Sequence, residues 1–545
     1  MAAYLDSLKN ISFDKATLME VAPKVGQGLG VLAALFVTYY AIWIAYTLTI
    51  HPLNKYPGPF MAKITNFYSV YHAYIGDLHL DMLRCHEKYG EFIRYGPNKV
   101  VTNTEKAVQD IYGRNANVQK STAYRAFETS PTAHDLQSTV DKRLHQFKRR
   151  VMSQAFSEAA LRKLEDHVLV HVKTFVDRLG SGGADGEKIA DAKPGSWTPN
   201  TNIARMCSYV SFDLMAELVF GKAFHMLDNS DNRFIIDLIQ VAAFRVGVCL
   251  QMPALAIWQV DRIFTPAVRK IRDQYVALSK KMAVDRMNMD HKRQDLFSHI
   301  LKAKDPETGK GFNMDELWGE STLLIIAGSD AISTGMAGVF YYFGRHPECY
   351  KKACEEVRST FSNRDEIRSG DKLQSCKYLR ACIDESMRMS PPVGGALWRE
   401  VCKGGVNIQG KIIPEGYDCG VPIYAIHHNP EYYPDPYEFK PERWLVGGEM
   451  NNSQESVDLA RRAFQAFSIG PVGCVGKNLA YMELTNTMAA TAFSLDMQPM
   501  SEPQKNPPKE KYLEGFEKHS SLEYRLRDRF TSWKDGPMLS FRVKT

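Results

Sequence analysis

One cysteine lies in the most distinctive loop of the chain, Phe467–Gly476, directly before the predicted helix Lys477–Leu484. Glycines let this loop turn tightly, and Gly476 would let a flat ligand approach the main chain. Because Cys474 lies near the positive end of the helix, its position predicts a lowered thiol pKa and a thiolate that binds a metal. The alternative is a structural cysteine buried in a glycine turn, and the loop alone does not decide between the two.

Charged residues recur at helical spacing in two other places. Glu385 and Arg388 lie at i and i+3 on one predicted helical face, just before a Ser-Pro-Pro run that ends the helix. His145 and Arg149 lie at i and i+4 in a basic helix, so they face the same side. A basic residue alone is more often a solvated surface group, so these motifs carry meaning only together.

A long helix is predicted over Asp315–Phe343, about 29 residues or roughly 43 Å. Its apolar middle contains Gly328 and Asp330. A glycine inside a helix costs about 1 kcal/mol relative to alanine, and a buried aspartate costs more unless it has a partner. A structural kink and a functional site both explain this pair.

The rest of the chain supports one large globular fold. Of its 545 residues 44% are hydrophobic and 24% charged, and a net charge of +6 is too dilute to indicate a nucleic-acid binder. The ten cysteines include no C-x-x-C pair, which predicts reduced thiols rather than a disulfide framework or zinc site.

Helical periodicity dominates the sequence, as in Ala159–Leu179, Asn202–Val219 and Phe234–Val248, with β-like pieces at Phe92–Tyr95 and Val406–Ile413. Two aromatic and Met/Val-rich runs, Asn115–Thr132 and Phe224–Pro253, are either pocket lining or plain core.

The N-terminal region predicts a single membrane anchor. Residues 29–50 are apolar and uncharged over a length that crosses a bilayer as one helix. A cleaved signal peptide and a buried core helix are the alternatives. Residues 1–28 then form a lumenal tail, 51–60 a proline-rich hinge, and 61–545 one cytosolic domain, because lysines without nearby acids follow the helix.

In this order the motifs resemble those of the cytochrome P450 superfamily, over essentially the whole chain after the anchor and most closely its microsomal, fungal-type members. The resemblance implies a mainly α fold with small β-sheets and a haem b whose axial ligand is the thiolate of Cys474, with Phe467 and Gly476 beside it. It implies that Arg399, His145 and Arg149 bind the haem propionates. It also implies that Glu385, Arg388 and Arg443, which lies in the segment Tyr437–Trp444, form a structural charge triad.

Two positions depart from the family pattern. Val472 stands where a basic residue is usual, which removes one expected propionate contact. Ala331 stands where the long helix usually carries a threonine that serves iron-bound dioxygen. The resemblance assigns catalytic roles to Gly328 and Asp330, and Thr334, which shares a helical face with position 331, is the expected substitute hydroxyl. A water bound to Asp330 or a hydroxyl of the substrate are further proton routes.

The resemblance implies a membrane-anchored monooxygenase that inserts one atom of O2 into an apolar organic substrate, as a tailoring step in fungal secondary metabolism. It implies a monomer in the endoplasmic reticulum membrane that takes electrons from NADPH–cytochrome reductase. Lys148, Arg150 and Lys477 are expected contacts for the acidic surface of the reductase. Two other hypotheses are a reductase-independent haem-thiolate isomerase or dehydratase, which Ala331 motivates, and a non-catalytic haem protein that binds an apolar ligand.

We predict that Ala331→Thr retains oxygenation and changes the fraction of electrons lost as peroxide, because it restores a hydroxyl to the long helix. Peroxide formed per NADPH consumed measures this fraction. Equal yields in the variant and the wild type would show that position 331 has no part in coupling.

Overall fold

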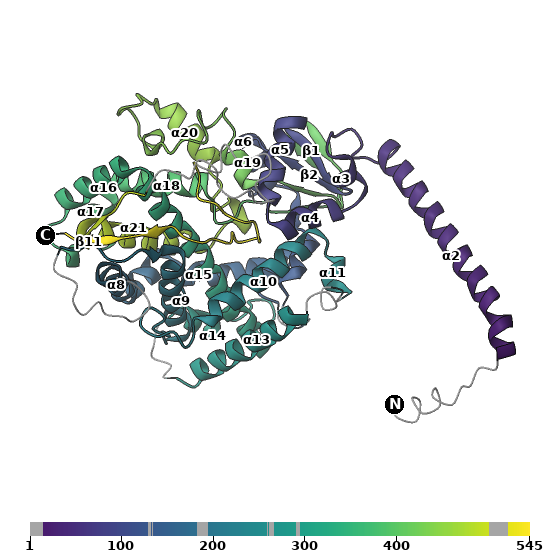
Figure 1. Ribbon diagram of the computed structural model, residues 1–545, viewed down its shortest axis with the longest axis horizontal. Helices are drawn as coiled ribbons and strands as arrows, with labels where there is room; N and C mark the ends of the chain where they lie inside the picture. The colour runs from purple at the N-terminus through teal and green to yellow at the C-terminus, as the bar shows by residue number, and fades with distance from the viewer. Residues whose placement is uncertain are drawn as a thin grey trace.

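The computed structural model describes residues 15–128, 132, 134–182, 195–258, 260, 266–289, 295–500 and 522–544. Within these ranges the molecule is a mainly helical body with small β-sheets, and one long helix projects from it (Figure 1). The mainly α architecture with small sheets is as predicted.

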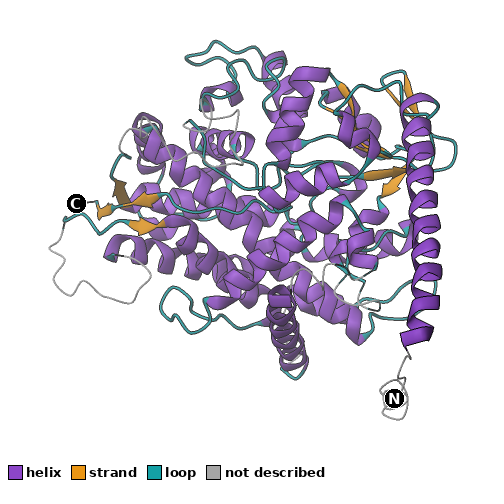
Figure 2. Cartoon of the chain, turned by 45° about the vertical axis from the view of Figure 1, so that its right-hand side comes forward, coloured by secondary structure: helices purple, strands orange, loops and turns teal. Residues whose placement is uncertain are grey.

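The projecting helix is α2, Lys15–Thr49. Its segment Gly26–Thr49 has a mean hydropathy of 1.9, and none of its most apolar 18-residue window is buried against the body. Figure 2 shows α2 standing along one edge of the molecule, with the C-terminus at the opposite edge. A long apolar helix that the body does not cover is suited to a bilayer. It also extends into the predicted tail, since residues 15–28 are helical.

Two other helices are long and apolar enough to cross a membrane by length and composition, α10, Phe234–Gln251, and α15, Met314–Arg345. In α15, 72% of the most apolar window is buried inside the body, and in α10 the share is 39%. Their apolar residues therefore serve the core and, as described below, line a cavity.

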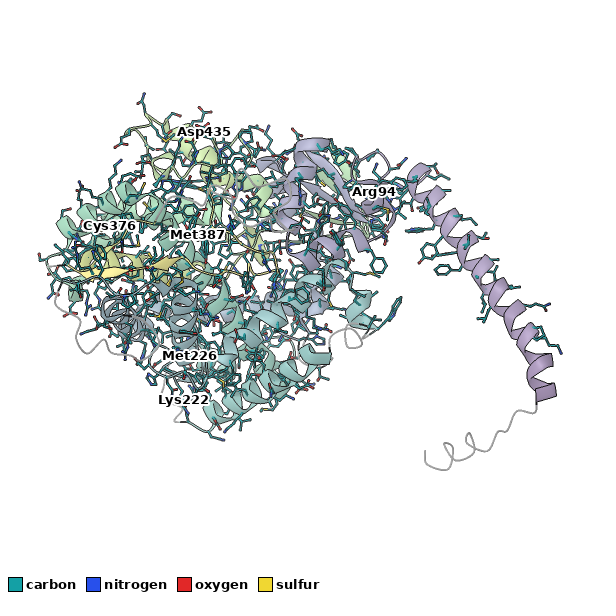
Figure 3. The ribbon with its side chains drawn as sticks, in the orientation of Figure 1. Arg94, Lys222, Met226, Cys376, Met387 and Asp435 are labelled. Carbon is teal, nitrogen blue, oxygen red and sulfur yellow. The ribbon has the colours of Figure 1, made fainter. Side chains whose placement is uncertain are left out.

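The C-terminal end of α2 is fixed to the body by Arg94 of strand β1, Phe92–Gly96. The guanidinium donates from Nη1 to the carbonyl of Thr47 at 2.9 Å and from Nη2 to the carbonyl of Pro97 at 2.8 Å. Figure 3 shows Arg94 in the small sheet beside the end of α2. Leu53 of the hinge is fully buried, so the hinge packs against the body at this residue.

A five-stranded sheet lies beside this attachment, in the order β1-β2-β8-β5-β3. The strands β2 and β8 pair in parallel and the other neighbours pair antiparallel. The β-like segment Val406–Ile413 forms the antiparallel hairpin β6–β7. The strand bounds are β2 Lys99–Thr102, β3 Val118–Lys120, β4 Thr201–Asn202, β5 Arg399–Val401, β6 Val406–Ile408, β7 Lys411–Ile413, β8 Asp418–Gly420, β9 Leu495–Met497, β10 Met538–Leu539 and β11 Phe541–Val543.

Helices make up the rest of the body, and the three predicted from periodicity are present as α8, α9 and α10. The remaining bounds are α3 Phe60–Ile64, α4 Phe67–Ile75, α5 Leu78–Tyr89, α6 Glu105–Tyr112, α7 Lys142–Ala155, α8 Glu158–Ser181, α9 Ile203–Phe220, α11 Ala254–Ile257, α13 Pro266–Met287, α14 Leu296–Lys302, α16 Pro347–Thr360, α17 Asp371–Ser375, α18 Lys377–Met389, α19 Ile423–His427, α20 Gln454–Ala463 and α21 Lys477–Ser494, with 3-10 helices η1 Thr122–Phe127, η2 Arg364–Glu366, η3 Pro441–Trp444 and η4 Gly470–Val472.

Helix α15 crosses the middle of the body (Figure 1) and begins with a capping box between Asn313 and Glu316. It runs without interruption through Gly328. A Cβ at this position would lie 2.6 Å from the sulfur of Met215 on α9, so a larger residue would displace the end of that side chain. The glycine therefore leaves room for Met215 beside the helix.

The carboxylate of Glu385 on α18 joins two arginines in a fully buried network. Arg388 donates to both carboxylate oxygens at 2.9 Å, and Arg443 of η3 donates from Nε at 2.9 Å. The indole of Trp444 adds a further donor at 3.0 Å. Burial alone would raise the pKa of Glu385, but the two guanidinium groups hold it below its ordinary value. The expected structural charge triad is thus present.

We predict that Glu385→Gln lowers the free energy of unfolding by about 3–5 kcal/mol, because it leaves two buried guanidinium groups without their counter-charge. Chemical denaturation of the full chain in detergent measures this. Glu355→Gln is the control, since Glu355 faces an exposed lysine 3.9 Å away and its loss should change little. A Glu385→Gln loss as small as that of the control would contradict the prediction.

The same difference should depend on pH in a defined direction. Since the folded-state pKa of Glu385 lies below its ordinary value of 4.5, the stabilisation is complete above that pH and is lost as the pH falls through the folded-state value. The stability difference between the wild type and Glu385→Gln should therefore shrink only in acid.

Candidate active site

A cavity of about 390 Å³ lies between α10, α15, η1, the cysteine loop Phe467–Gly476 and the C-terminal segment 522–535. Its walls are mostly aliphatic and aromatic, and the two runs Asn115–Thr132 and Phe224–Pro253 contribute side chains such as Tyr124, Leu238 and Val246. Met387 of α18, labelled near the centre of Figure 3, also lines it. The sequence left open whether these runs line a pocket or form plain core, and the structure shows that residues of both runs line the cavity.

The cysteine loop holds Cys474 at the wall of this cavity, where Phe467 and Gly476 also lie. The amide of Cys474 donates to the carbonyl of Phe467 at 2.8 Å, which closes the loop before α21 begins. Gly470 has φ 72° and packs against the main chain of Tyr112 so closely that a Cβ would overlap its carbonyl oxygen. Only glycine fits this turn, so the backbone dictates where the sulfur lies.

The thiol of Cys474 does not have the lowered pKa that the helix position predicts. Burial raises the pKa above its ordinary value, although hydrogen bonds to the sulfur from the amides of Gly476 and Lys477 and the positive charges of Arg149 and Lys477 all act to lower it. The prediction is wrong for the chain by itself because desolvation outweighs the helix end. The same donors are nevertheless aimed at the sulfur, where they stabilise a thiolate once a cation binds it.

Four basic side chains, which we call the cationic cluster, line one end of the cavity: Lys120, His145, Arg149 and Arg399. Burial, together with the neighbouring cations, lowers the pKa of Lys120 to about 7 and that of His145 to about 3. Within the described ranges none of the four forms an ion pair with a carboxylate. Instead Lys120 donates to main-chain carbonyls at 2.5 and 2.9 Å, Arg149 to the carbonyl of Gly473, and Arg399 to the carbonyl of Trp398 at 2.9 Å.

The cationic cluster fits a ligand with negative charge at one edge and a flat apolar body. Positive groups gathered beside an apolar cavity repel one another and need an anion to offset their charge. Haem b carries two carboxylates at one edge of a flat ring, and the thiol of Cys474 lies on the same cavity. The residues present therefore fit this group.

Lys120 is the member of the cluster that the sequence did not single out. It ends β3, directly opposite Arg399 in the antiparallel register with β5, which brings the two cations together. The signal in the sequence that could have identified it is that Lys120 lies in the run Asn115–Thr132, which lines the cavity. Val472 occupies a position where a basic residue is usual, so one cation is missing there. Lys120 supplies a cation to the same cavity from another segment of the chain.

Asp330 lies buried next to the cavity with its carboxylate fully engaged. The ammonium group of Lys534 and the amide of Gln240 donate to Oδ1 at 2.9 and 2.8 Å, and the hydroxyl of Thr531 donates to Oδ2 at 2.5 Å. Gly328 and Ala331 of the same helix line the cavity.

The expectation for Thr334 is wrong. Its side chain is fully buried and is absent from the cavity wall, and its hydroxyl donates to the carbonyl of Asp330 at 2.9 Å within its own helix. Position 334 is turned by about 60° from position 331 around the helix, whereas Gly335, one turn on, does line the cavity.

The expectation that Lys148 contacts the reductase is also wrong. Its ammonium group is fully buried, 3.1 Å from Glu320 and 3.2 Å from Glu316 at the start of α15, so it cannot contact another protein. Arg150 and Lys477 are exposed, as a docking role requires.

Comparison with known proteins agrees with this site. A model of the cytochrome P450 family matches residues 56–521. The chain belongs to the cytochrome P450 family. Members of this family bind haem b through a cysteine thiolate.

Relatives from fungi share most of their length with this cytochrome P450. It is 38% identical over 518 residues to cytochrome P450 monooxygenase AKT7 of Alternaria alternata, covering 94% of this chain and 97% of the relative. It is 40% identical to monooxygenase apf7 of Gibberella fujikuroi, over 92% of this chain and 96% of the relative, and 40% identical to monooxygenase atnE of Emericella nidulans, over 93% and 95%. Family and relatives together identify an oxidoreductase of the monooxygenase kind.

We predict that Lys120→Gln speeds haem loss roughly tenfold, because a charged hydrogen bond contributes about 1.5–3 kcal/mol. Transfer of haem from this cytochrome P450 to an acceptor protein measures the rate. Lys120→Arg should keep slow loss, and Lys106→Gln, which removes an exposed charge, is the control. Equal rates for Lys120→Gln and Lys106→Gln would exclude Lys120 from the haem site.

Proposed function

We propose that this cytochrome P450 is a membrane-anchored haem-thiolate monooxygenase that inserts one atom of O2 into an apolar organic substrate. The observation that carries the proposal is the single cavity that joins Cys474, the cationic cluster and an apolar wall. Its similarity to microsomal fungal members supports a tailoring step in secondary metabolism.

In this proposal the thiolate of Cys474 would bind the haem iron, and the bound haem would supply the centre at which O2 is activated. Phe467 and Gly476 would line the space for the ring, and His145, Arg149, Arg399 and Lys120 would hold its carboxylates. The glycines of the loop and the hydrogen bonds at the sulfur keep the thiolate oriented.

The chain's other residues manage the substrate and protons. The apolar side chains of α10, α15 and the C-terminal segment exclude water and orient an apolar molecule. Gly328 leaves room for the side chain of Met215 beside the cavity. Asp330, with its hydrogen bonds to Gln240, Thr531 and Lys534, is proposed as part of the proton route.

The proposal also includes the electron donor and the cellular location of the protein. Arg150 and Lys477 offer exposed positive charges for the acidic surface of NADPH–cytochrome reductase, which would supply the electrons. The apolar segment Gly26–Thr49 supports anchoring of a monomer in the endoplasmic reticulum membrane, with the catalytic domain in the cytosol. On this view residues 29–50 are the anchor and 61–545 the catalytic domain.

We expect Cys474→Ala to abolish the thiolate carbonyl spectrum and to lower product formation about 100-fold or more, because the thiolate of Cys474 would supply the electron density that the bound haem needs for oxygen activation. The measurement compares metabolites of cells that express the chain with a reductase, with and without the substitution. Cys402→Ala, which alters a half-buried thiol outside the cavity wall, is the control.

Two outcomes would replace the proposal. Product that forms without NADPH and reductase would identify an isomerase or dehydratase, the function that Ala331 suggests. A thiolate spectrum with ligand binding but no product under any condition would identify a non-catalytic binding protein.

A further inference from the structure

A hydroxyl group does reach the cavity beside Asp330, although not from α15. Thr531 of the C-terminal segment lines the cavity, and its Oγ1 donates to Oδ2 of Asp330 at 2.5 Å. Ala331, the next residue on the helix, lines the same cavity with a methyl group. Two segments 201 residues apart in sequence thus bring an acid and an alcohol together at the cavity wall.

The C-terminal segment is held so that Thr531 keeps this position. The amide of Ser532 donates to the carbonyl of Pro392 at 2.8 Å, and the hydroxyl of Thr334 reaches the carbonyl of Ser532 at 3.4 Å. The hydroxyl of Thr334, whose shorter hydrogen bond is to the carbonyl of Asp330 at 2.9 Å, thus also touches the backbone next to Thr531.

Lys534 supplies the third group of this network. Its ammonium lies 2.9 Å from Oδ1 of Asp330, and both side chains are almost completely buried, at 2% and 4% exposure. The amide of Gln240 on α10 donates to the same oxygen at 2.8 Å. Lys534 and Gln240 both reach Oδ1, so among the described residues the hydroxyl of Thr531 is the donor that satisfies Oδ2. The same side chain also lines the cavity, so one hydroxyl contacts both the buried carboxylate and the cavity.

We infer that Thr531 delivers protons into the cavity in place of the threonine that α15 lacks at position 331, with Asp330 and Lys534 behind it. The inference rests on the proposed function. In each transfer Lys534 first passes an ammonium proton to the carboxylate of Asp330, and Asp330 passes a proton to the Thr531 oxygen while Thr531 gives its own hydroxyl proton to an acceptor in the cavity. The neutral amine of Lys534 then takes up a proton from solvent, which is the H⁺ of the overall equation. The overall reaction is RH + O2 + NADPH + H⁺ → ROH + H2O + NADP⁺, with both electrons from NADPH.

Two products of O2 reduction report this delivery without knowledge of the substrate. Without RH, the enzyme and its reductase form peroxide by NADPH + H⁺ + O2 → NADP⁺ + H2O2, or water by 2 NADPH + 2 H⁺ + O2 → 2 NADP⁺ + 2 H2O. Cleavage of the O–O bond to water needs protons at the correct oxygen, so weaker delivery shifts electrons to peroxide.

The experiment compares Thr531→Val with the wild type, using the full chain, purified reductase, NADPH and O2. We expect the water-forming rate to fall at least fivefold in Thr531→Val. Thr531→Ser should restore most of it because the hydroxyl returns. Thr491→Val, which removes a buried hydroxyl that donates within α21, is the matched control. Adding Ala331→Thr to Thr531→Val should recover at least half of the lost rate, because it supplies a hydroxyl from α15.

A second readout needs neither reductase nor O2. Carbon monoxide bound to the reduced protein reports nearby hydroxyl groups through its stretching frequency, which we expect Thr531→Val to shift and Thr531→Ser to leave near the wild-type value. If Thr531→Val does not take up haem, Thr531→Ala removes the same hydroxyl without a change in branching.

An unchanged stretching frequency together with an unchanged water-forming rate in Thr531→Val would overturn the inference, as would a wild type that forms peroxide alone. Failure of the proposed function looks different: the wild type, with an intact thiolate spectrum, would then consume no NADPH with the reductase present.

Discussion

The structure depends on positive charge that the chain does not neutralise by itself. Lys120, His145, Arg149 and Arg399 face an apolar cavity, and within the described residues none of them forms an ion pair with a carboxylate. Burial first and repulsion between neighbouring cations second lower the pKa of Lys120 to about 7 and that of His145 to about 3. An anionic ligand converts this repulsion into binding, so the cost of gathering the cations is offset only when the ligand is present.

The fold brings these groups together through long-range packing. Lys120 and Arg399 meet across β3 and β5, while His145 and Arg149 come from one face of α7. On the other side, the cysteine loop passes so close to Tyr112 that it needs a glycine at position 470. The buried network of Glu385 fixes α18 to η3, behind the cavity wall that Met387 forms. None of these three parts forms a site alone. The site exists because the fold holds the cationic cluster and the cysteine loop around one cavity.

Local patterns allowed prediction of the parts whose geometry is local. The long helix and the Glu385–Arg388 pair follow from spacing within short segments, and the structure contains both as predicted. The third member of the triad, Arg443, lies 58 residues from Glu385 and was expected only from the family resemblance. Contacts between distant segments could not be foreseen, so Lys120, Thr531 and Lys534 were missed. Errors arose where tertiary context overrode a local rule: a rotation of about 60° took Thr334 away from the cavity, and burial reversed the expected pKa shift of Cys474.

The aspartate inside α15 shows how far the site extends along the chain. A carboxylate in an apolar helix is costly unless it is paired, and the partner here is Lys534, close to the C-terminus. The need to satisfy Asp330 therefore draws the C-terminal segment onto the cavity, and this segment brings Thr531 and Phe530 to the wall. An interaction required by burial thus also decides which side chains face the substrate. Changes in the segment 522–535 should consequently alter cavity chemistry and helix stability together, because the same carboxylate serves both.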